Sequence, residues 1–356
     1  MKKVSVIGIV LTFLCLAAFV WTGSDDKKGN EKKKEIAWGL LMKANVDQGK
    51  TIVIGKENIP KGQPISAAAE PAFSNSTLAK DFNLDTAKIE EAAGAKGVLN
   101  DEEGVFKVSY ARNDIKVVVD GTTLAPFMGL TSWAAFMPGM KEQAMVMGDM
   151  VLFQDEVNPA MSSALDNGLA VTALHNHFFY DEPKVYFMHI GGEGDAIKLA
   201  ASVKKIQDRI KEVRSASPQL AKGFGQKPLA AMSNITPKPI EDILGKGQAK
   251  DGMFKVVLGR TTKMPCGCTI GKEMGVNTWA AFYGTNDHAL VDGDFAVFEG
   301  ELQRVLKSLR GSGINIVAIH SHMESENPRV LFLHYWGVGP TVDLAKALKG
   351  AMKTDS

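Results

Sequence analysis

Cysteine is scarce in this sequence, and an excess of charge of either sign is nearly absent. Only three cysteines occur in 356 residues, which excludes the dense disulfide framework of small secreted domains. The formal net charge of +1 gives no support for nucleic-acid binding, which normally requires a basic surface. The remaining composition, 45% hydrophobic and 23% charged, is that of an ordinary globular protein. The length suggests two domain-sized units.

An apolar run begins the chain. Two lysines precede an uncharged, mostly apolar segment from about residue 4 to residue 21, and small residues follow at 22–24. This order predicts a secretory signal, 1–24, cleaved after Ser24. The run is also nearly long enough to serve as an uncleaved membrane anchor. We therefore expect an exported protein, periplasmic or associated with the cell envelope, that contacts a membrane only through this segment.

Histidine is scarce too, yet six of the seven histidines fall in two matched groups. Each group begins with His-x-His, continues through a polar segment with a proline, and ends with a third histidine after an apolar run. The first and third histidines are fourteen residues apart in both groups, from 175 to 189 and from 320 to 334. The members are His175, His177 and His189 in the first group and His320, His322 and His334 in the second.

The spacing around each group has the period of two expected for a strand. A hairpin that pairs residue 175 with residue 189 would place all three histidines on one face. Their imidazoles could then converge on one ion. Three neutral imidazoles suit a transition metal with an open ligand position. Zn is the expected metal, and Cu, Fe and Mn also fit. The alternatives are acid–base or substrate-binding histidines without a metal, and hydrogen-bonded histidines on a half-exposed sheet.

The histidine groups belong to a longer internal duplication. The segments IEEAAG and IEDILG correspond, as do the two copies of Trp-Ala-Ala-Phe, at 133–136 and 279–282. Gly-Asp precedes the first histidine by the same distance in each copy, from 149 to 175 and from 294 to 320. Such constant register indicates a tandem repeat. We predict a linker and extension at 25–84, repeat one at 85–210, a connector at 211–237 and repeat two at 238–356.

Each copy is predicted to contain three strands, a helix, the histidine hairpin and a last helix. The middle helices are expected at about 156–167 and 300–310, and the last helices at 195–206 and 341–352, with Asp195 and Thr341 as N-caps. The fold class is therefore α+β, with two pseudo-symmetric repeats, each a mainly antiparallel sheet covered by helices.

A family resemblance rests on residues 148–177, GDMVLFQDEVNPAMSSALDNGLAVTALHNH, and 184–200, KVYFMHIGGEGDAIKLA. These segments resemble the LppY/LpqO family of exported bacterial proteins, a domain of unknown function. The resemblance covers most of 85–210 and extends more weakly over 238–352. It implies an exported protein built from this domain, and it implies no activity.

Carboxylates near the histidines could complete a metal shell or act as a general base. Asp181 and Glu326 each follow the second histidine of a group by four residues and are candidate metal ligands. Glu156 and Glu301 each precede the first histidine by nineteen residues, near a helix start. They are candidate catalytic residues, or partners of the helix dipole. Asp149 and Asp294 follow a glycine and are expected to cap a turn.

Two further features stand outside the duplication. Cys266 and Cys268 could bind a soft metal, form a redox-labile pair or pack as small loop residues. His288 has no counterpart in repeat one and is expected at the surface. Trp133 and Trp279, within the duplication, are expected in the core.

The leading hypothesis is an exported metal-binding protein with one three-histidine site in each repeat and an unknown small-molecule or envelope ligand. If the protein is an enzyme, metal-assisted hydrolysis is the expected reaction class. The alternatives are a non-catalytic envelope module that binds a glycan or a protein, and a metal storage or delivery protein.

Overall fold

The computed structural model describes residues 83–353, which fall within one compact unit. The expected signal segment and most of the region 25–84 lie outside the described residues. Within residues 83–353 no helix combines the length and the apolar character needed to cross a bilayer.

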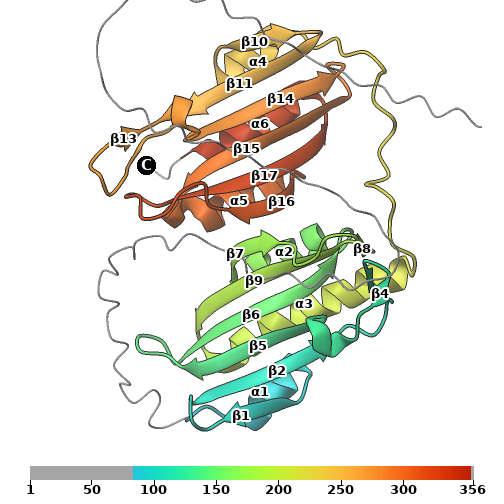
Figure 1. Ribbon diagram of the computed structural model, residues 1–356, viewed down its shortest axis with the longest axis vertical. Helices are drawn as coiled ribbons and strands as arrows, with labels where there is room; N and C mark the ends of the chain where they lie inside the picture. The colour runs from blue at the N-terminus through green and yellow to red at the C-terminus, as the bar shows by residue number, and fades with distance from the viewer. Residues whose placement is uncertain (1–82, 354–356) are drawn as a thin grey trace, which may run out of the picture. The chain divides into compact units, whose positions relative to one another are not determined.

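The two halves of the described chain contain the same main elements in the same order (Figure 1). Repeat one comprises α1 (Thr86–Ala93), β1 (Gly97–Asn100), β2 (Val105–Ala111), β5 (Thr131–Pro138), β6 (Ala144–Phe153), α2 (Val157–Asp166), β7 (Ala170–His175), β9 (Val185–Gly194) and α3 (Ala196–Ala216). Repeat two comprises α4 (Pro237–Leu244), β10 (Gly247–Lys250), β11 (Met253–Gly259), β14 (Asn277–Gly284), β15 (Ala289–Phe298), α5 (Leu302–Gly311), β16 (Asn315–His320), β17 (Val330–Gly339) and α6 (Thr341–Met352).

Short elements occupy the connections. They are the strands β3 (Val118–Val119), β4 (Thr122–Thr123), β8 (Asp181–Glu182), β12 (Thr262–Lys263) and β13 (Thr269–Ile270), and the 3-10 helices η1 (Pro126–Met128), η2 (Lys272–Met274) and η3 (Glu299–Glu301).

The sheet is antiparallel throughout and has the order β1-β2-β5-β6-β9-β7-β16-β17-β15-β14-β11-β10. In each repeat the helices cover one face of the strands (Figure 1), and a large apolar core fills the space between them. The α+β class and the tandem duplication are thus confirmed. The joining of the two halves into one sheet was not predicted.

The junction between the repeats is a symmetric pairing. Strands β7 and β16 meet at Leu174 and Ile319, which occupy equivalent positions in the two copies. The Asn158 amide bonds both backbone groups of Ile316, at 2.8 and 3.2 Å. Its counterpart, Gln303, bonds both backbone groups of Val171, at 2.8 Å each. Equivalent residues of the two repeats therefore make equivalent contacts across the junction, as a pseudo-two-fold axis requires.

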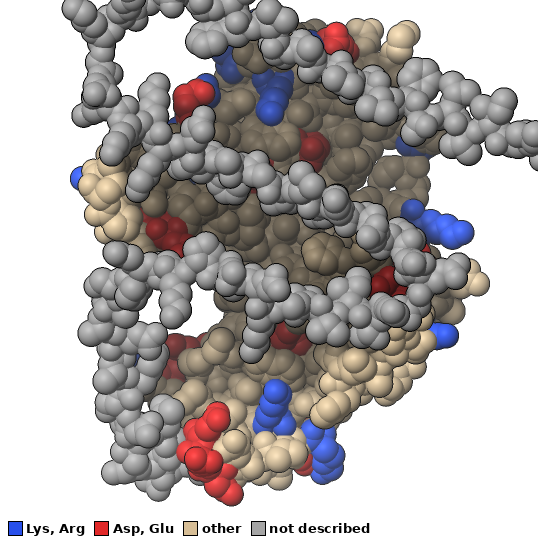
Figure 2. Space-filling model, viewed as in Figure 1, with Lys and Arg blue, Asp and Glu red and all other residues tan. Residues whose placement is uncertain are grey.

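The opposite face of the sheet carries the histidines. On this face smaller apolar clusters pack around Phe187 in repeat one and around Phe332 in repeat two. On the uncovered part of the face shown in Figure 2, Lys and Arg stand mainly around the rim and form no continuous patch.

Three expectations are corrected by the fold. Trp133 and Trp279 are half-buried on the histidine face, each with a lysine ammonium 4.2 Å from its ring, rather than in the core. The helix expected at 195–206 continues to Ala216 because its apolar stripe does, through Ile206 and Ile210. Asp195 caps α3 as predicted, but Pro340, not Thr341, precedes the first turn of α6.

Candidate metal centre

The third histidine of each group is placed by the middle of the sheet. His189 on β9 has Asp149 of β6 directly opposite on one side and Ala173 of β7 on the other. In repeat two, β17 places His334 between Asp294 and Ala318 in the same way. Directly opposed residues point to the same face of a sheet. Each third histidine therefore lies beside a carboxylate.

The first histidine ends the neighbouring strand, and the second lies just beyond it. The expected pairing of residue 175 with residue 189 is wrong, because Ala173 rather than His175 lies opposite His189, beyond a register shift between Val171 and Ala173. His175 instead opposes Phe187, two residues along β9, and so remains on the face of His189. The two rings stack with their centroids 5.0 Å apart. In repeat two the corresponding shift lies between residues 316 and 318.

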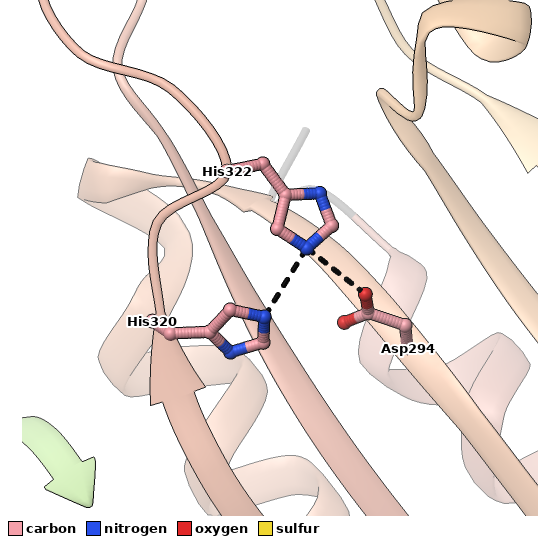
Figure 3. Close-up of side chains that lie close together, drawn as sticks. All are labelled: Asp294, His320 and His322. Atoms are coloured by element: carbon pink, nitrogen blue, oxygen red, sulfur yellow. Dashed lines mark hydrogen bonds and ion pairs between the residues drawn. The ribbon is translucent and has the colours of Figure 1, made fainter. Parts of the chain in front are cut away.

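Three side chains of repeat two converge (Figure 3). The Nε2 atoms of His320 and His322 are 3.1 Å apart, and His322 Nε2 is 3.4 Å from an Asp294 carboxylate oxygen. One potential ligand atom from each residue lies within 4.8 Å of the others. Two ligands at about 2.0–2.1 Å from a tetrahedral ion lie about 3.3 Å apart. This cluster can hold a metal ion.

Repeat one has the same histidine contact. The Nε2 atoms of His175 and His177 are also 3.1 Å apart. The second histidine of each repeat stacks on a buried phenylalanine, with His177 over Phe187 and His322 over Phe332 at 3.4 Å between ring centroids. These stacking contacts orient the imidazoles although both residues lie outside the strands.

Several polar atoms at these sites are buried and lack a partner. Among the described residues, nothing hydrogen-bonds to one carboxylate oxygen each of Asp149 and Asp294, or to Nδ1 of His320. An unpaired buried carboxylate oxygen is costly, because burial removes the water that would solvate it. A bound cation would remove that cost.

Burial is the main reason that the pKa values of His175, His177 and His320 lie below the ordinary value of 6.5. Repulsion from neighbouring imidazoles lowers each pKa further, whereas Asp149 or Asp294 opposes the shift. The neutral imidazole that binds a metal is therefore favoured at neutral pH.

Among the described residues, the cluster that could hold a metal contains neither of the expected carboxylate ligands, Asp181 and Glu326. Asp181 accepts hydrogen bonds from Lys184 Nζ at 2.8 Å and from the Val185 backbone N–H at 2.7 Å. Glu326 accepts one from the Val330 backbone N–H at 2.9 Å. Both carboxylates therefore hold the loop that leads into the next strand.

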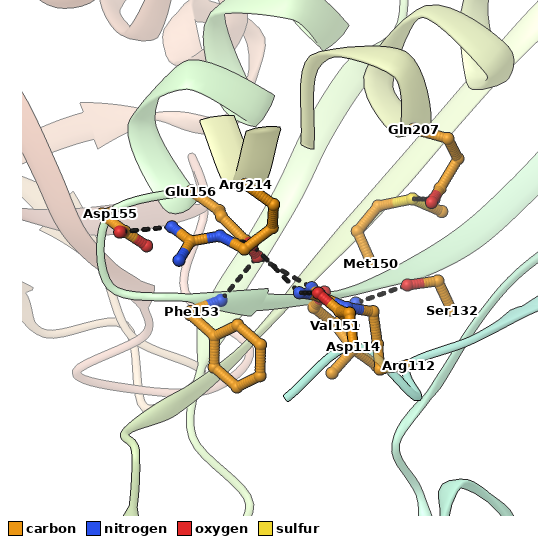
Figure 4. A network of polar contacts seen from close by, with 10 residues as sticks. All are labelled: Arg112, Asp114, Ser132, Met150, Val151, Phe153, Asp155, Glu156, Gln207 and Arg214. Atoms are coloured by element: carbon orange, nitrogen blue, oxygen red, sulfur yellow. Dashed lines mark hydrogen bonds and ion pairs between the residues drawn. The ribbon is translucent and has the colours of Figure 1, made fainter. Parts of the chain in front are cut away.

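The candidate catalytic glutamates lie in ion pairs at the helix starts. Glu156 is fully buried and accepts hydrogen bonds from both terminal nitrogens of Arg112, at 2.7 and 3.0 Å. It also pairs with Arg214 and accepts the Phe153 backbone N–H (Figure 4). In repeat two, Glu301 pairs with Arg260 at 2.5 Å. These contacts fit residues that stabilise the start of a helix. A general base would need a free carboxylate oxygen.

Asp149 and Asp294 are the residues that the sequence reasoning missed. The expected turn is wrong, because both lie in the middle of long strands. The available signal was their constant distance from the first histidine of each group.

Cys266 and Cys268 are free and exposed beside the short strand β13, and their sulfur atoms contact each other. His288 is half-buried near the backbone of Lys227.

Comparison with known proteins adds a family and a distant structural match. The model of the family described as Domain of Unknown Function (DUF1259) matches residues 87–209 and 238–354. No curated protein matches the chain. A trimeric bacterial microcompartment shell protein, PduB, is similar at 10% identity and a TM-score of 0.20, over 71% of this chain and 88% of that chain. A similarity this low carries no argument about function.

Proposed function

Because this chain belongs to the family described as Domain of Unknown Function (DUF1259), whose description supplies no activity, we propose its function from the site alone. Each repeat binds one divalent transition-metal ion. The ligands in repeat two are Asp294, His320, His322 and His334, and those in repeat one are Asp149, His175, His177 and His189. The convergence of Asp294, His320 and His322 carries the proposal.

Three imidazoles and one carboxylate favour zinc, and the same donors also bind other first-row metals. A divalent ion with one carboxylate retains a net positive charge, so an anionic or polarisable ligand would be attracted to it. The resemblance to the LppY/LpqO family remains a prediction from residues 148–200. The export of the chain remains a prediction from residues 1–24.

Metal-assisted hydrolysis is a second candidate. His177 and His322 are exposed, so a bound ion would be accessible from solvent, as catalytic metals are and closed structural metals are not. Glu156 and Glu301 would stabilise the domain rather than take part in this chemistry.

The test is a titration of Co²⁺ into the full chain after chelator treatment. Tetrahedral Co²⁺ absorbs visible light far more strongly than hexahydrated Co²⁺, so binding at these ligands should produce a visible band. The His322→Ala variant should lose the part of the band that belongs to repeat two. His288→Ala, which removes the one histidine outside the two groups, should keep the whole band. A titration without a visible band would contradict the proposal.

A further inference from the structure

A cavity of about 410 Å³ lies beside the histidines of repeat two. Strands β15, β16 and β17 of repeat two form one side of it, and β9 and the start of α2 in repeat one form another. His334 lines the cavity, which therefore adjoins the candidate metal centre of repeat two.

Aromatic rings form much of the wall. Trp336 comes from β17, Tyr186 from β9 and Phe224 from the connector between the repeats. Phe224 is 57% exposed, so its ring is partly accessible at the surface. Aromatic faces attract cations and apolar groups alike, because the π-system carries negative charge on its face.

Asp292 adds a carboxylate to this wall. It lies directly opposite Trp336 in the sheet, so the two side chains are neighbours on one face. Among the described residues, nothing forms an ion pair or a hydrogen bond with this carboxylate. No lysine or arginine lines the cavity.

The other polar groups of the lining are the ring nitrogens of His334, the hydroxyl of Tyr186, the indole N–H of Trp336 and two side-chain amides. The amide of Asn158 is occupied on both its nitrogen and its oxygen by the backbone of Ile316. Gln154 then provides the one side-chain amide that remains in the lining.

The geometry points to a binding site for an organic cation, an ammonium group with an apolar body, held by Asp292 and the rings of Trp336, Tyr186 and Phe224. Repeat one has no matching site of its own. At the equivalent positions of repeat one, methionine (Met147) replaces Asp292 and glycine (Gly191) replaces Trp336. The charge that selects the cation comes from Asp292, which is not a proposed metal ligand, so the metal-free protein tests this proposal by itself.

The experiment is isothermal titration of the chelator-treated full chain with choline and with its neutral isostere, 3,3-dimethylbutan-1-ol. Choline should bind about tenfold more tightly, the difference expected from one cation–π contact plus a carboxylate. Asp292→Asn should abolish this preference. Trp336→Gly, which installs the residue of repeat one, should weaken choline binding about tenfold.

Two controls separate this site from general effects. Asp101→Asn removes the same charge from an exposed turn and should leave choline binding unchanged. Met147→Ala changes the matched position of repeat one and should also have no effect. Equal binding of choline and the isostere, no binding of either, or full choline binding by Asp292→Asn would each overturn the proposal. Titration with metal present reports separately on the metal centre.

Discussion

At the scale of single residues, Asp294 and Glu156 differ in whether a buried carboxylate has a partner. Asp294 is 4% exposed, and one of its oxygens has no hydrogen bond among the described residues. Glu156 is fully buried, but arginines satisfy its oxygens. The first arrangement is expected of a ligand site and the second of a structural ion pair.

Asp294→Asn should therefore have opposite effects on metal binding and on the stability of the metal-free protein. Loss of a ligand should weaken zinc binding at repeat two by at least the 10–100-fold that is typical of outer-shell changes. The metal-free protein should be as stable as wild type, or more so, because an unpaired buried charge disappears. Competition with a chromophoric chelator and thermal unfolding in chelator measure the two effects. Unchanged zinc affinity would exclude Asp294 as a ligand.

Glu156→Gln should give the reverse result. Removal of one partner from a buried ion pair costs about 3–5 kcal/mol, so the free energy of unfolding should fall steeply in a denaturant titration. Zinc stoichiometry should remain that of wild type. Glu301→Gln should cost less, because the Glu301 side chain is 17% exposed. A Glu156→Gln protein of normal stability but without any activity found for wild type would restore the catalytic role predicted from the sequence.

At the scale of elements, the sequence predicted the helices and strands well and their register less well. Alternation around His175 and the apolar stripe of α5 are local signals, and both elements formed where expected. The bulges in β7 and β16 depend on contacts across the sheet, so local periodicity could not predict them. Gly-Asp predicts a turn from the sequence alone, because no sequence rule distinguishes a turn glycine from one required by strand packing.

The glycine of this motif has a steric reason. A Cβ at Gly293 would lie 2.1 Å from the carbonyl oxygen of Trp279 and 2.3 Å from the Tyr335 hydroxyl, which donates a 2.8 Å hydrogen bond to that carbonyl. Gly293→Ala should lower the free energy of unfolding by about 1–3 kcal/mol or more, as overpacked cores do. Gly300→Ala, where nothing lies within 4 Å of the added carbon, is the matched control and should change it little. Equal stability of the two variants would contradict this packing.

The loop before β9 should make stability depend on pH. Burial alone raises the pKa of Asp181, but hydrogen bonds from Lys184 and Val185 outweigh it and hold the pKa below the ordinary value of 3.8. A folded pKa below the unfolded one stabilises the protein above that value. The contribution is lost as pH falls through the unfolded pKa toward the folded one. Asp181→Asn should therefore show a smaller loss of stability between about pH 5 and pH 3 than wild type. The same loss of stability with falling pH in both proteins would contradict this prediction.

At the scale of the whole molecule, duplication explains why two similar sites exist and how they differ. The repeats share the Asp and His framework, and their junction exchanges matched contacts through Asn158 and Gln303. The sequence predicted two copies with equivalent sites. The joining of β7 to β16 rests on long-range pairing that no local pattern reveals. The cavity beside His334 follows from that junction and from Trp336, so it too could not be predicted.

Elemental analysis of the full chain, beside two triple variants, tests the central claim most directly. One variant replaces His175, His177 and His189 with alanine, and the other replaces His320, His322 and His334. Two equivalents of one transition metal per wild-type chain, and one equivalent in each variant, are the predicted result. Metal-free wild-type protein that takes up no zinc when it is added, with unfolding unaffected by chelator, would contradict the account.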